Sequence, residues 1–202
     1  MFTKFKLFEN DAYSHIIPFQ GKLDLNNVKF AFNEHSEVLN KYLLRYYIIN
    51  EKRPAYFDEI ITDKNQNILF GKSVDKGKFN YTLNFRNDNG PMVFDNNKTS
   101  KCGLVDETGI NILVNDEYDH VKLDNGFWIL TTGKELDEIS IANRDGKVLM
   151  KKNGFFDSIN VYENRGFVQY KLKNKQSYEI MNFDEFFSTN WELKILLDKY
   201  NI

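Results

Sequence analysis

The chain has 202 residues, of which 42% are apolar and 15% aromatic, including 18 Phe and 11 Tyr. This much bulky apolar surface excludes a disordered chain and predicts one large globular unit with its own hydrophobic core. The 27 basic and 29 acidic residues give a formal charge of −2, which excludes a global field that attracts phosphate backbones or anionic lipid.

Residues 1–53 are expected to form an N-terminal cap of mixed α/β structure. Leu39, Tyr42 and Leu43 follow the i, i+3, i+4 spacing of a helix face, which predicts a helix from about residue 36 to residue 44. The aromatic and β-branched run Tyr46-Tyr47-Ile48-Ile49 favours a strand directly after it.

Residues 54–184 are expected to form a β-rich region. Short apolar runs alternate here with Asn-Gly and Asp-Gly pairs, which supply the positive φ that hairpin turns need. The strand-like runs are Phe79–Phe85, Phe127–Thr131, Val148–Met150 and Gly166–Leu172. We therefore predict a mainly β fold, an antiparallel β-meander in which similar units follow one another.

A five-residue unit recurs within this region. It reads Tyr56-Phe57-Asp58-Glu59-Ile60, Glu117-Tyr118-Asp119-His120-Val121 and Phe155-Phe156-Asp157-Ser158-Ile159. The last two copies also share a preceding turn segment, residues 103–109 and 140–146. Such self-similarity indicates an internal repeat whose copies stack to complete a shared core.

One copy resembles a known family. Residues 101–109, Ile112-Leu113 and residues 117–121 resemble the WG repeat of bacterial proteins, with Cys102 in place of the Trp of that family. The next copy, Glu138-Ile139-Ser140-Ile141, has no Trp-Gly pair. The resemblance covers about half of the chain and implies a β-rich scaffold without a single shared activity.

Residues 185–202 are expected to form a short C-terminal helix. Thr189-Asn190-Trp191-Glu192 is a capping-box pattern, and Leu193, Leu196, Leu197 and Tyr200 then fall on one helical face. We expect this helix to close the same unit that the cap and the β region form.

The remaining composition bounds the location and the chemistry. Cys102 is the single cysteine, and the three histidines show no zinc-ligand spacing. No signal peptide and no membrane span is recognisable. We therefore expect a cytoplasmic protein with no metal, no cofactor and no membrane contact, and its oligomeric state stays open.

The recurring Asp58, Asp119 and Asp157 have two interpretations. Three carboxylates at one structural position are able to line up along a stacked sheet and bind a cation or a basic partner. The favoured interpretation is that each accepts backbone hydrogen bonds in the turn that closes its unit. A calcium loop starting at Asp63 is rejected, because Ile68 and Val74 occupy the positions that need Gly and Glu.

The sequence contains two further candidate sites, one at Cys102 and one in a basic strand. Cys102 is interpreted as a core residue rather than a nucleophile. Arg165, Lys171, Lys173 and Lys175 flank strand residues that echo an RNA-recognition signature. However, Phe167 and Tyr170 are three apart and point to opposite faces. Nucleic acid is therefore the less favoured partner.

The leading hypothesis is a non-enzymatic protein-binding module. Its expected contact patch consists of Trp128, Tyr118, His120, Glu135, Asp137 and Glu138, because aromatic anchors beside charge dominate interface energetics. By analogy, one form of such a module is a bacterial or phage inhibitor or immunity protein that occludes a toxin or defence enzyme. The alternatives are a nucleic-acid or nucleotide binder and a hydrolase of unrecognised type.

Overall fold

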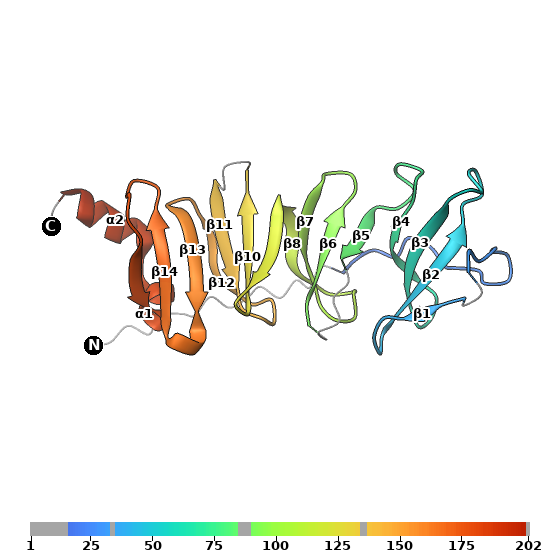
Figure 1. Ribbon diagram of the computed structural model, residues 1–202, viewed down its shortest axis with the longest axis horizontal. Coiled ribbons are helices and arrows are strands. Elements are labelled where there is room, and N and C mark those ends of the chain that lie inside the picture. Colours follow the sequence, from blue (N-terminus) through green and yellow to red (C-terminus); the bar gives the residue numbers. More distant parts are fainter. Residues whose placement is uncertain (1–15, 33–34, 85–89, 134–136, 201–202) are drawn as a thin grey trace.

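The computed structural model describes residues 16–32, 35–84, 90–133 and 137–200. It is mainly β, with four antiparallel sheets that follow one another along the chain. The sheets form an elongated row, and the C-terminal helices lie at one end of it (Figure 1). The prediction of a mainly β, antiparallel fold is confirmed.

Each sheet is built from strands that are consecutive in sequence. The first sheet contains β1 (Glu37–Val38), β2 (Leu43–Ile49), β3 (Phe57–Asp63) and β4 (Ile68–Lys72). The second contains β5 (Tyr81–Asn84), β6 (Met92–Asn96), β7 (Lys101–Val105) and β8 (Ile112–Tyr118). The predicted boundary between the N-terminal cap and the β-rich region, at residues 53 and 54, falls inside the first sheet, between β2 and β3.

The third and fourth sheets form the second half of the row, and two helices follow them. The third sheet contains β9 (His120–Asp124), β10 (Phe127–Thr132), β11 (Glu138–Ala142) and β12 (Val148–Asn153). The fourth contains β13 (Phe156–Tyr162), β14 (Phe167–Leu172) and β15 (Glu179–Asn182), with the 3₁₀ turn η1 (Glu163–Arg165). The helices α1 (Phe183–Ser188) and α2 (Trp191–Tyr200) follow it.

The hydrophobic core lies between successive sheets, so inner sheets are buried on both faces. Strand β10 shows this best, because its residues from Phe127 to Thr131 are all buried. Phe127 and Ile129 pack toward the fourth sheet, whereas Trp128 and Leu130 pack toward the second. Since successive side chains of a strand point to opposite faces, a strand between two cores reads as a continuous apolar run.

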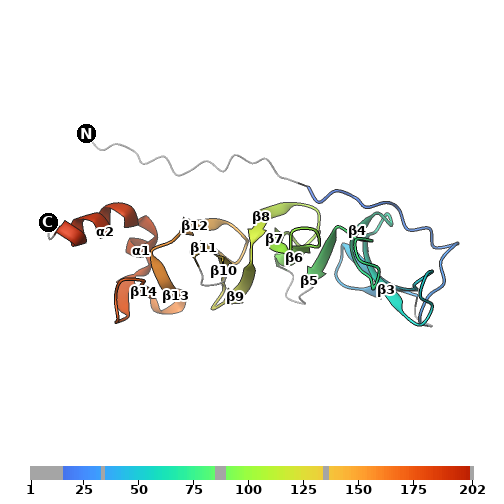
Figure 2. The ribbon, with the colours of Figure 1, turned by 90° about the horizontal axis from the view of Figure 1, so that it is seen from above.

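The N-terminal segment 16–32 forms a strap across the first two sheets (Figure 2). The backbone N–H of Ile17 donates to the carbonyl of Ile110, and that of Gln20 donates to Ile68, at 2.9 and 2.8 Å. Further along, Leu23 joins the buried cluster of Tyr46 and Ile48. The strap therefore runs against the chain direction of the sheets and covers the outer face of the first sheet.

The predicted helix from about residue 36 to residue 44 is wrong. Residues 37–49 form the hairpin of β1 and β2 instead. The side-chain Oδ1 of Asn40 accepts hydrogen bonds from the N–H groups of Tyr42 and Leu43, at 2.8 and 2.9 Å. This Asx turn competes with helix formation and reverses the chain. The strand predicted after residue 44 is present as part of β2.

Short polar side chains close the strand connections. Asp106 Oδ1 accepts from the N–H groups of Ile110 and Asn111 between β7 and β8. Asn143 Oδ1 accepts from the N–H of Lys147 between β11 and β12. At the end of β15, Asn182 Oδ1 accepts from two N–H groups in the first turn of α1. The same local chemistry therefore closes hairpins and caps a helix.

The predicted C-terminal helix is confirmed as α2. Asn190 Oδ1 accepts from the N–H of Leu193 at 3.1 Å, which places the capping residue inside the predicted motif. Trp191 is buried, and Ile195 packs against the same core. The leucines of the predicted apolar face lie outward instead.

Candidate protein-binding surface

The two aromatic residues of the predicted contact patch, Trp128 and Tyr118, are buried. The prediction that they contact a partner is therefore wrong. Trp128 is 2% exposed and Tyr118 is 1% exposed, because both belong to the core between the second and third sheets. The indole Nε1–H of Trp128 donates to the carbonyl of Arg144 at 3.2 Å. The Tyr118 hydroxyl is 3.1 Å from Ser140 Oγ. Neither ring is available to a partner.

The polar members of the predicted patch have different positions. His120 and Asp137 are exposed, and Glu138 is half-buried. Glu135 lies outside the described residues. With the two rings in the core, these side chains lose the apolar centre that makes a contact surface favourable.

Two of the three recurring aspartates, Asp58 and Asp157, are each the second residue of a strand, whereas Asp119 lies between two strands. Asp58 lies in β3, Asp119 lies between β8 and β9, and Asp157 lies in β13. Within the described residues, no group of three or more His, Cys, Asp or Glu side chains is arranged to hold a metal ion. A shared cation site built from these carboxylates is therefore wrong.

Asp119 and Asp157 each form an ion pair with a lysine of a neighbouring strand, and Asp119 also accepts a backbone hydrogen bond. Asp119 Oδ2 accepts from the backbone N–H of Gly133 at 2.7 Å, and both its oxygens lie 2.8 Å from Lys101 Nζ. The hydrogen bond from Lys101, followed by that from Gly133, lowers the pKa of Asp119. Asp157 Oδ2 accepts from Lys171 Nζ at 2.7 Å. Asp119 thus accepts a backbone hydrogen bond, but from Gly133 after β10 and not from the turn that closes its own unit, as the favoured interpretation predicted.

Asp58 differs from the other two because it is buried, with an exposure of 1%. Its Oδ1 accepts from Asn50 Nδ2 at 2.9 Å and from Ser73 Oγ at 2.5 Å. Its Oδ2 accepts from Lys78 Nζ at 2.5 Å. Burial by itself raises the pKa of Asp58, but the hydrogen bonds from Asn50, Lys78 and Ser73 and the charge of Lys78 outweigh it and lower the pKa.

This shift predicts a pH dependence of stability. Because the folded pKa of Asp58 lies below its ordinary value of 3.8, its ionisation stabilises the fold above that pH, and this contribution is lost as the pH falls through the folded pKa. We expect the difference in unfolding free energy between wild type and Asp58→Asn to shrink as the pH falls below about 4. Urea unfolding at several pH values measures it. A difference that stays constant from neutral to acid pH contradicts the lowered pKa.

Cys102 is a core residue, as predicted. It is 6% exposed, and its Sγ lies 3.3 Å from the carbonyl oxygen of Tyr118. Burial, followed by the charges of Asp95 and Asp119, raises the pKa of Cys102 to about 11. A thiol with this pKa is protonated at neutral pH and is a poor nucleophile.

Two of the cations proposed for nucleic acid contact their own chain. Lys171 is paired with Asp157, and the hydrogen bond to that carboxylate raises the pKa of Lys171. Arg165 lies in η1 with its guanidinium 6.0 Å from the ring centroid of Tyr162. An ion pair within the chain reduces the charge that is available to a phosphate backbone.

The other two cations differ from each other, and the neighbouring aromatics lie on opposite faces of β14. Lys173 Nζ donates to the carbonyl of Asp137 at 2.9 Å, and Lys175 is exposed just after β14. Tyr170 is buried, whereas Phe167 lies on the other face of β14. The two rings therefore do not share a surface on which bases can stack, as their spacing in the sequence predicted.

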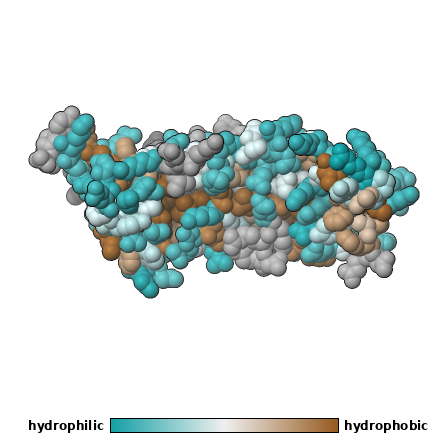
Figure 3. Space-filling model, turned by 45° about the horizontal axis from the view of Figure 1, so that its top comes forward, coloured by the Kyte–Doolittle hydropathy of each residue, from teal (hydrophilic) through white to brown (hydrophobic). Residues whose placement is uncertain are grey.

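An exposed aromatic cluster lies at the other end of the row. Phe32, Tyr47 and Phe57 form a mutually contacting trio, with ring centroids 5.4, 5.5 and 5.4 Å apart in edge-to-face geometry. We call this trio the aromatic corner. Phe32 is 52% exposed and Phe57 is 47% exposed. Figure 3 shows brown and pale brown atoms gathered at this end of the molecule.

The aromatic corner comes from three separate places in the chain. Tyr47 lies in β2 and Phe57 in β3, two pairs apart in the register that pairs Ile49 with Phe57, so both rings lie on the same face of the sheet. Phe32 follows the strap residues that pair with β2. Because no single sequence motif contains the three rings, sequence reasoning missed the cluster, although it identified both the Phe57 unit and the Tyr47 strand.

Charged groups lie beside the aromatic corner on β2 and its neighbours. Arg45 Nε is 2.9 Å from Glu59 Oε1, and Arg45 Nη1 is 3.2 Å from Glu37 Oε2. Arg45 Nη1 is also 3.5 Å from the Tyr47 hydroxyl. The guanidinium is thus held in place next to the rings, an arrangement of residue types that is common in interface hot spots.

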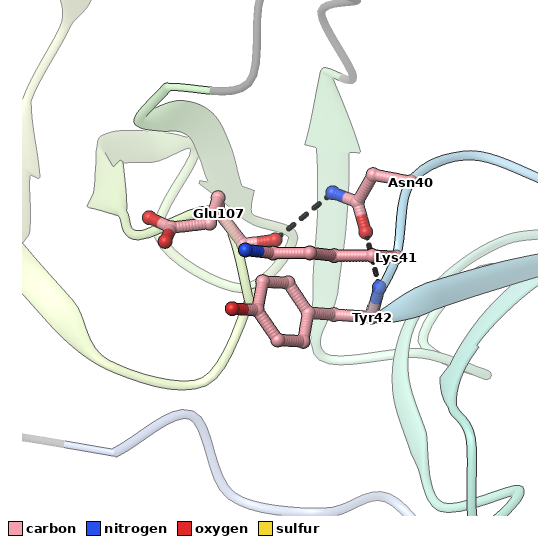
Figure 4. Close-up of a pocket in the computed structure, with 4 residues that line it drawn as sticks. All are labelled: Asn40, Lys41, Tyr42 and Glu107. Carbon is pink, nitrogen blue, oxygen red and sulfur yellow. Dashed lines mark hydrogen bonds between the residues drawn. The ribbon is translucent and has the colours of Figure 1, made fainter.

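A hollow of about 300 Å³ lies where the first two sheets meet and is lined by Asn40, Lys41, Tyr42 and Glu107. Lys41 extends over the Tyr42 ring, and Glu107 lies opposite (Figure 4). Asn40 Nδ2 donates to the carbonyl of Glu107 at 2.9 Å. These contacts join the β1–β2 turn to the β7–β8 turn. The four residues that line the hollow do not include a nucleophile placed beside a base, which nucleophilic catalysis requires.

A larger hollow of about 590 Å³ is lined by two acidic side chains, Asp75 and Asp95. Asp75 Oδ2 accepts from Asn50 Nδ2 at 3.0 Å, and Asp95 Oδ2 accepts from Asn84 Nδ2 at 2.9 Å. Both carboxylates are thus engaged by amides of the chain.

Comparison with known proteins does not identify a family. No family model matches the chain, and no curated protein matches it in sequence. A solved structure described as KlHsv2 with loop 6CD replaced by a Gly-Ser linker is similar to it, with 11% identity and a TM-score of 0.35. The match covers 74% of this chain and 48% of that one. A similarity this distant supports no inference about fold or function, and the WG-repeat resemblance stays a prediction.

None of the helices in the described ranges is long and apolar enough to cross a membrane.

Proposed function

We propose that this protein is a non-enzymatic protein-binding module and that the aromatic corner is its contact surface. The observation that carries the proposal is the packing of Phe32, Tyr47 and Phe57, which fixes three rings against one another while leaving two of them about half exposed. Rigid aromatic side chains bury a large apolar area on binding at little cost in conformational entropy.

The chemistry of the corner favours a protein over a small cation. A cation held by aromatic rings needs open space within about 6 Å of each ring face. Here the rings are packed edge to face against one another, so the space between them is filled by the rings themselves. Arg45 and its two glutamates supply the polar rim that surrounds the apolar centre of a protein interface.

A cytoplasmic inhibitor or immunity protein of a bacterium or phage, which covers a toxin or defence enzyme, is the form of this function that we propose. A broad row of sheets with one aromatic contact point suits blocking better than catalysis. This form rests on analogy with other small binding proteins.

A capture experiment with matched variants tests the proposal. Tagged wild type, Phe32→Ala/Phe57→Ala and a control, Tyr178→Ala, are incubated with nuclease-treated host lysate, and the bound proteins are quantified by mass spectrometry. Tyr178 is 53% exposed and precedes β15, in the fourth sheet. We expect one stoichiometric partner that wild type and the control retain and that the double variant binds at least about 30-fold more weakly.

The other outcomes decide against the proposal. A partner that the double variant retains in full places the contact surface elsewhere. A partner captured from untreated lysate but not from nuclease-treated lysate favours the basic residues near Arg165. A wild-type capture that is empty with both lysates contradicts the binding-module function itself. Melting temperatures of the variants within a few degrees of wild type show that a lost partner reflects a lost contact.

A further inference from the structure

The turns that precede β4, β8 and β12 share one geometry. Each contains a residue with a positive φ, namely Gln66 at 67°, Gly109 at 70° and Gly146 at 84°. The N–H of each of these residues donates to the carbonyl three residues earlier, at 3.0 or 3.1 Å. Each strand that follows is the edge of its sheet, and an edge strand presents backbone groups to which a further strand can pair. The three turns are therefore equivalent positions in successive sheets.

The strap pairs with the first two of these positions. Lys22 pairs antiparallel with Asn67 before β4, and Ile16 pairs antiparallel with Asn111 before β8. Beside the first pair, the N–H of Ile68 donates to a strap carbonyl at 2.8 Å. The residue numbers of the strap fall from the first turn to the second. The chain that precedes Ile16 therefore leads toward the third turn.

The third position offers the same backbone groups. The N–H of Asn143 donates to the carbonyl of Lys147 at 2.8 Å, and the next pair of the ladder joins Ala142 to Val148. Bonded and non-bonded pairs alternate in an antiparallel ladder, so the N–H of Val148 points away from β11, as that of Ile68 points away from β3. Within the described range of the strap, no residue pairs with this side of Val148.

A half-exposed leucine lies beside the third turn. Leu69 and Leu113 each occupy the register shift near the start of their edge strand. Leu69 is fully buried and shares a core cluster with Ile17 of the strap, whereas Leu113 is 37% exposed. A Cβ at Gly146 would lie 2.7 Å from Leu113 Cδ1, so this leucine reaches the third turn. The described residues thus leave open, over Leu113, the space that Ile17 fills over Leu69.

We propose that residues 1–15, which lie outside the described residues, continue the strap across the third turn and cover Leu113 with Tyr13. Successive side chains of an extended chain point to opposite sides. Ile17 is buried and Ile16 is 57% exposed, so Tyr13, four residues before Ile17, shares the inward side. Four extended residues span about 13 Å, which exceeds the roughly 10 Å between packed sheets.

This register repeats the pairing that the strap forms at the first turn. Ala12 pairs with Lys147. The N–H of Tyr13 donates to the carbonyl of Gly146, and the N–H of Val148 donates to the strap.

Connectivity favours this segment over an outside peptide. Because Ile16 is already fixed at the second turn, residues 1–15 are held near the third turn at an effective concentration on the order of millimolar. The proposal does not depend on the proposed function, because the aromatic corner lies at the other end of the strap.

Disulfide trapping in the full chain tests the pairing. Ala12→Cys/Lys147→Cys is oxidised under mild conditions, and the cross-linked peptide is quantified by mass spectrometry. We expect it to form as readily as the cross-link in Ile16→Cys/Asn111→Cys, since Ile16 and Asn111 are paired. Ala12→Cys/Lys122→Cys is the negative control, because Lys122 lies in β9, at the opposite edge of the third sheet.

Amide hydrogen exchange tests the role of Tyr13. The N–H of Val148 is expected to exchange slowly, like that of Ile68. Tyr13→Ser is expected to speed exchange at Val148 at least about tenfold, because it removes the buried ring that holds the segment. Exchange at Ile68 stays unchanged, which also shows that the variant is folded.

Three results overturn the proposal. The first is an N–H of Val148 that exchanges as fast as an unpaired amide, or whose protection persists in Tyr13→Ser. The second is a cross-link yield to Lys147 no higher than that to Lys122. The third is a cross-link that joins two copies of the chain, because a second copy is then the occupant of the third turn.

Discussion

Replacing Trp128 by Ala is expected to lower the free energy of unfolding by about 3–5 kcal/mol. The indole is 2% exposed and packs with Leu104, Leu130 and Tyr118 between the second and third sheets. Its removal leaves a cavity that these sheets can fill only by moving closer together, which would disturb their other contacts. For a chain of this size the melting temperature is expected to fall by about 6–20 °C, which differential scanning calorimetry measures.

Two variants make this result specific. Trp128→Phe keeps most of the apolar contact but leaves the Arg144 carbonyl without the indole donor, so a loss of about 1–3 kcal/mol is expected. Phe57→Ala, at a half-exposed ring, is expected to cost less than Trp128→Ala because its removal leaves no enclosed cavity. If Trp128→Ala melts within about 2 °C of wild type, Trp128 does not hold the second and third sheets together.

Replacing Asp58 by Ala is expected to lower the free energy of unfolding by a similar amount, about 3–5 kcal/mol. The change removes the acceptor that pairs with Lys78 and that also bonds Asn50 and Ser73. Asn50 is fully buried, so its amide cannot turn to water for a replacement partner. Urea unfolding at neutral pH measures the loss.

Asp157→Ala is the matched control, because Asp157 holds a lysine at 2.7 Å in the same way but is about half exposed. An exposed ion pair contributes about 0–1 kcal/mol, so this variant is expected to unfold close to wild type. A double change, Asp58→Ala with Lys78→Met, should cost less than the two single changes added together. Equal losses for Asp58→Ala and Asp157→Ala contradict a role for burial.

The sequence predicted the fold class and several of the strands. The four strand-like runs correspond to β5, β10, β12 and β14, and Gly109 and Gly146 have the positive φ of 70° and 84° that their turns require. Cys102 was correctly placed in the core. These are properties of short segments, in which turn residues and β-branched or aromatic side chains restrict the backbone locally.

The helix expected near residues 36–44 shows where local patterns mislead. The apolar spacing of Leu39, Tyr42 and Leu43 also suits a tight hairpin, because a turn brings residues on either side of it to the same core. Asn40 decides between the two, since its side chain bonds the turn backbone. The spacing of apolar residues does not reveal that a side-chain hydrogen bond will favour a turn over a helix.

The candidate site was the least predictable part of the molecule. Trp128 looked like a surface anchor because β10 is followed by an acidic stretch, yet it is buried in the core between the second and third sheets. The aromatic corner unites Phe32 with rings of β2 and β3, and sequence separation hides such a contact. Which aromatic residues are exposed depends on which faces the neighbouring sheets cover.

The sequence by itself determined that this protein is a mainly β chain of antiparallel hairpins that ends in a short helix, because turn chemistry, strand propensity and helix capping act over a few residues. Only the tertiary structure decided that the sheets stack with cores on both faces. This stacking buries Trp128 and Asp58 and leaves the aromatic corner and the leucines of α2 exposed. Burial is a property of packing between distant segments, and a single sequence does not state which segments will meet.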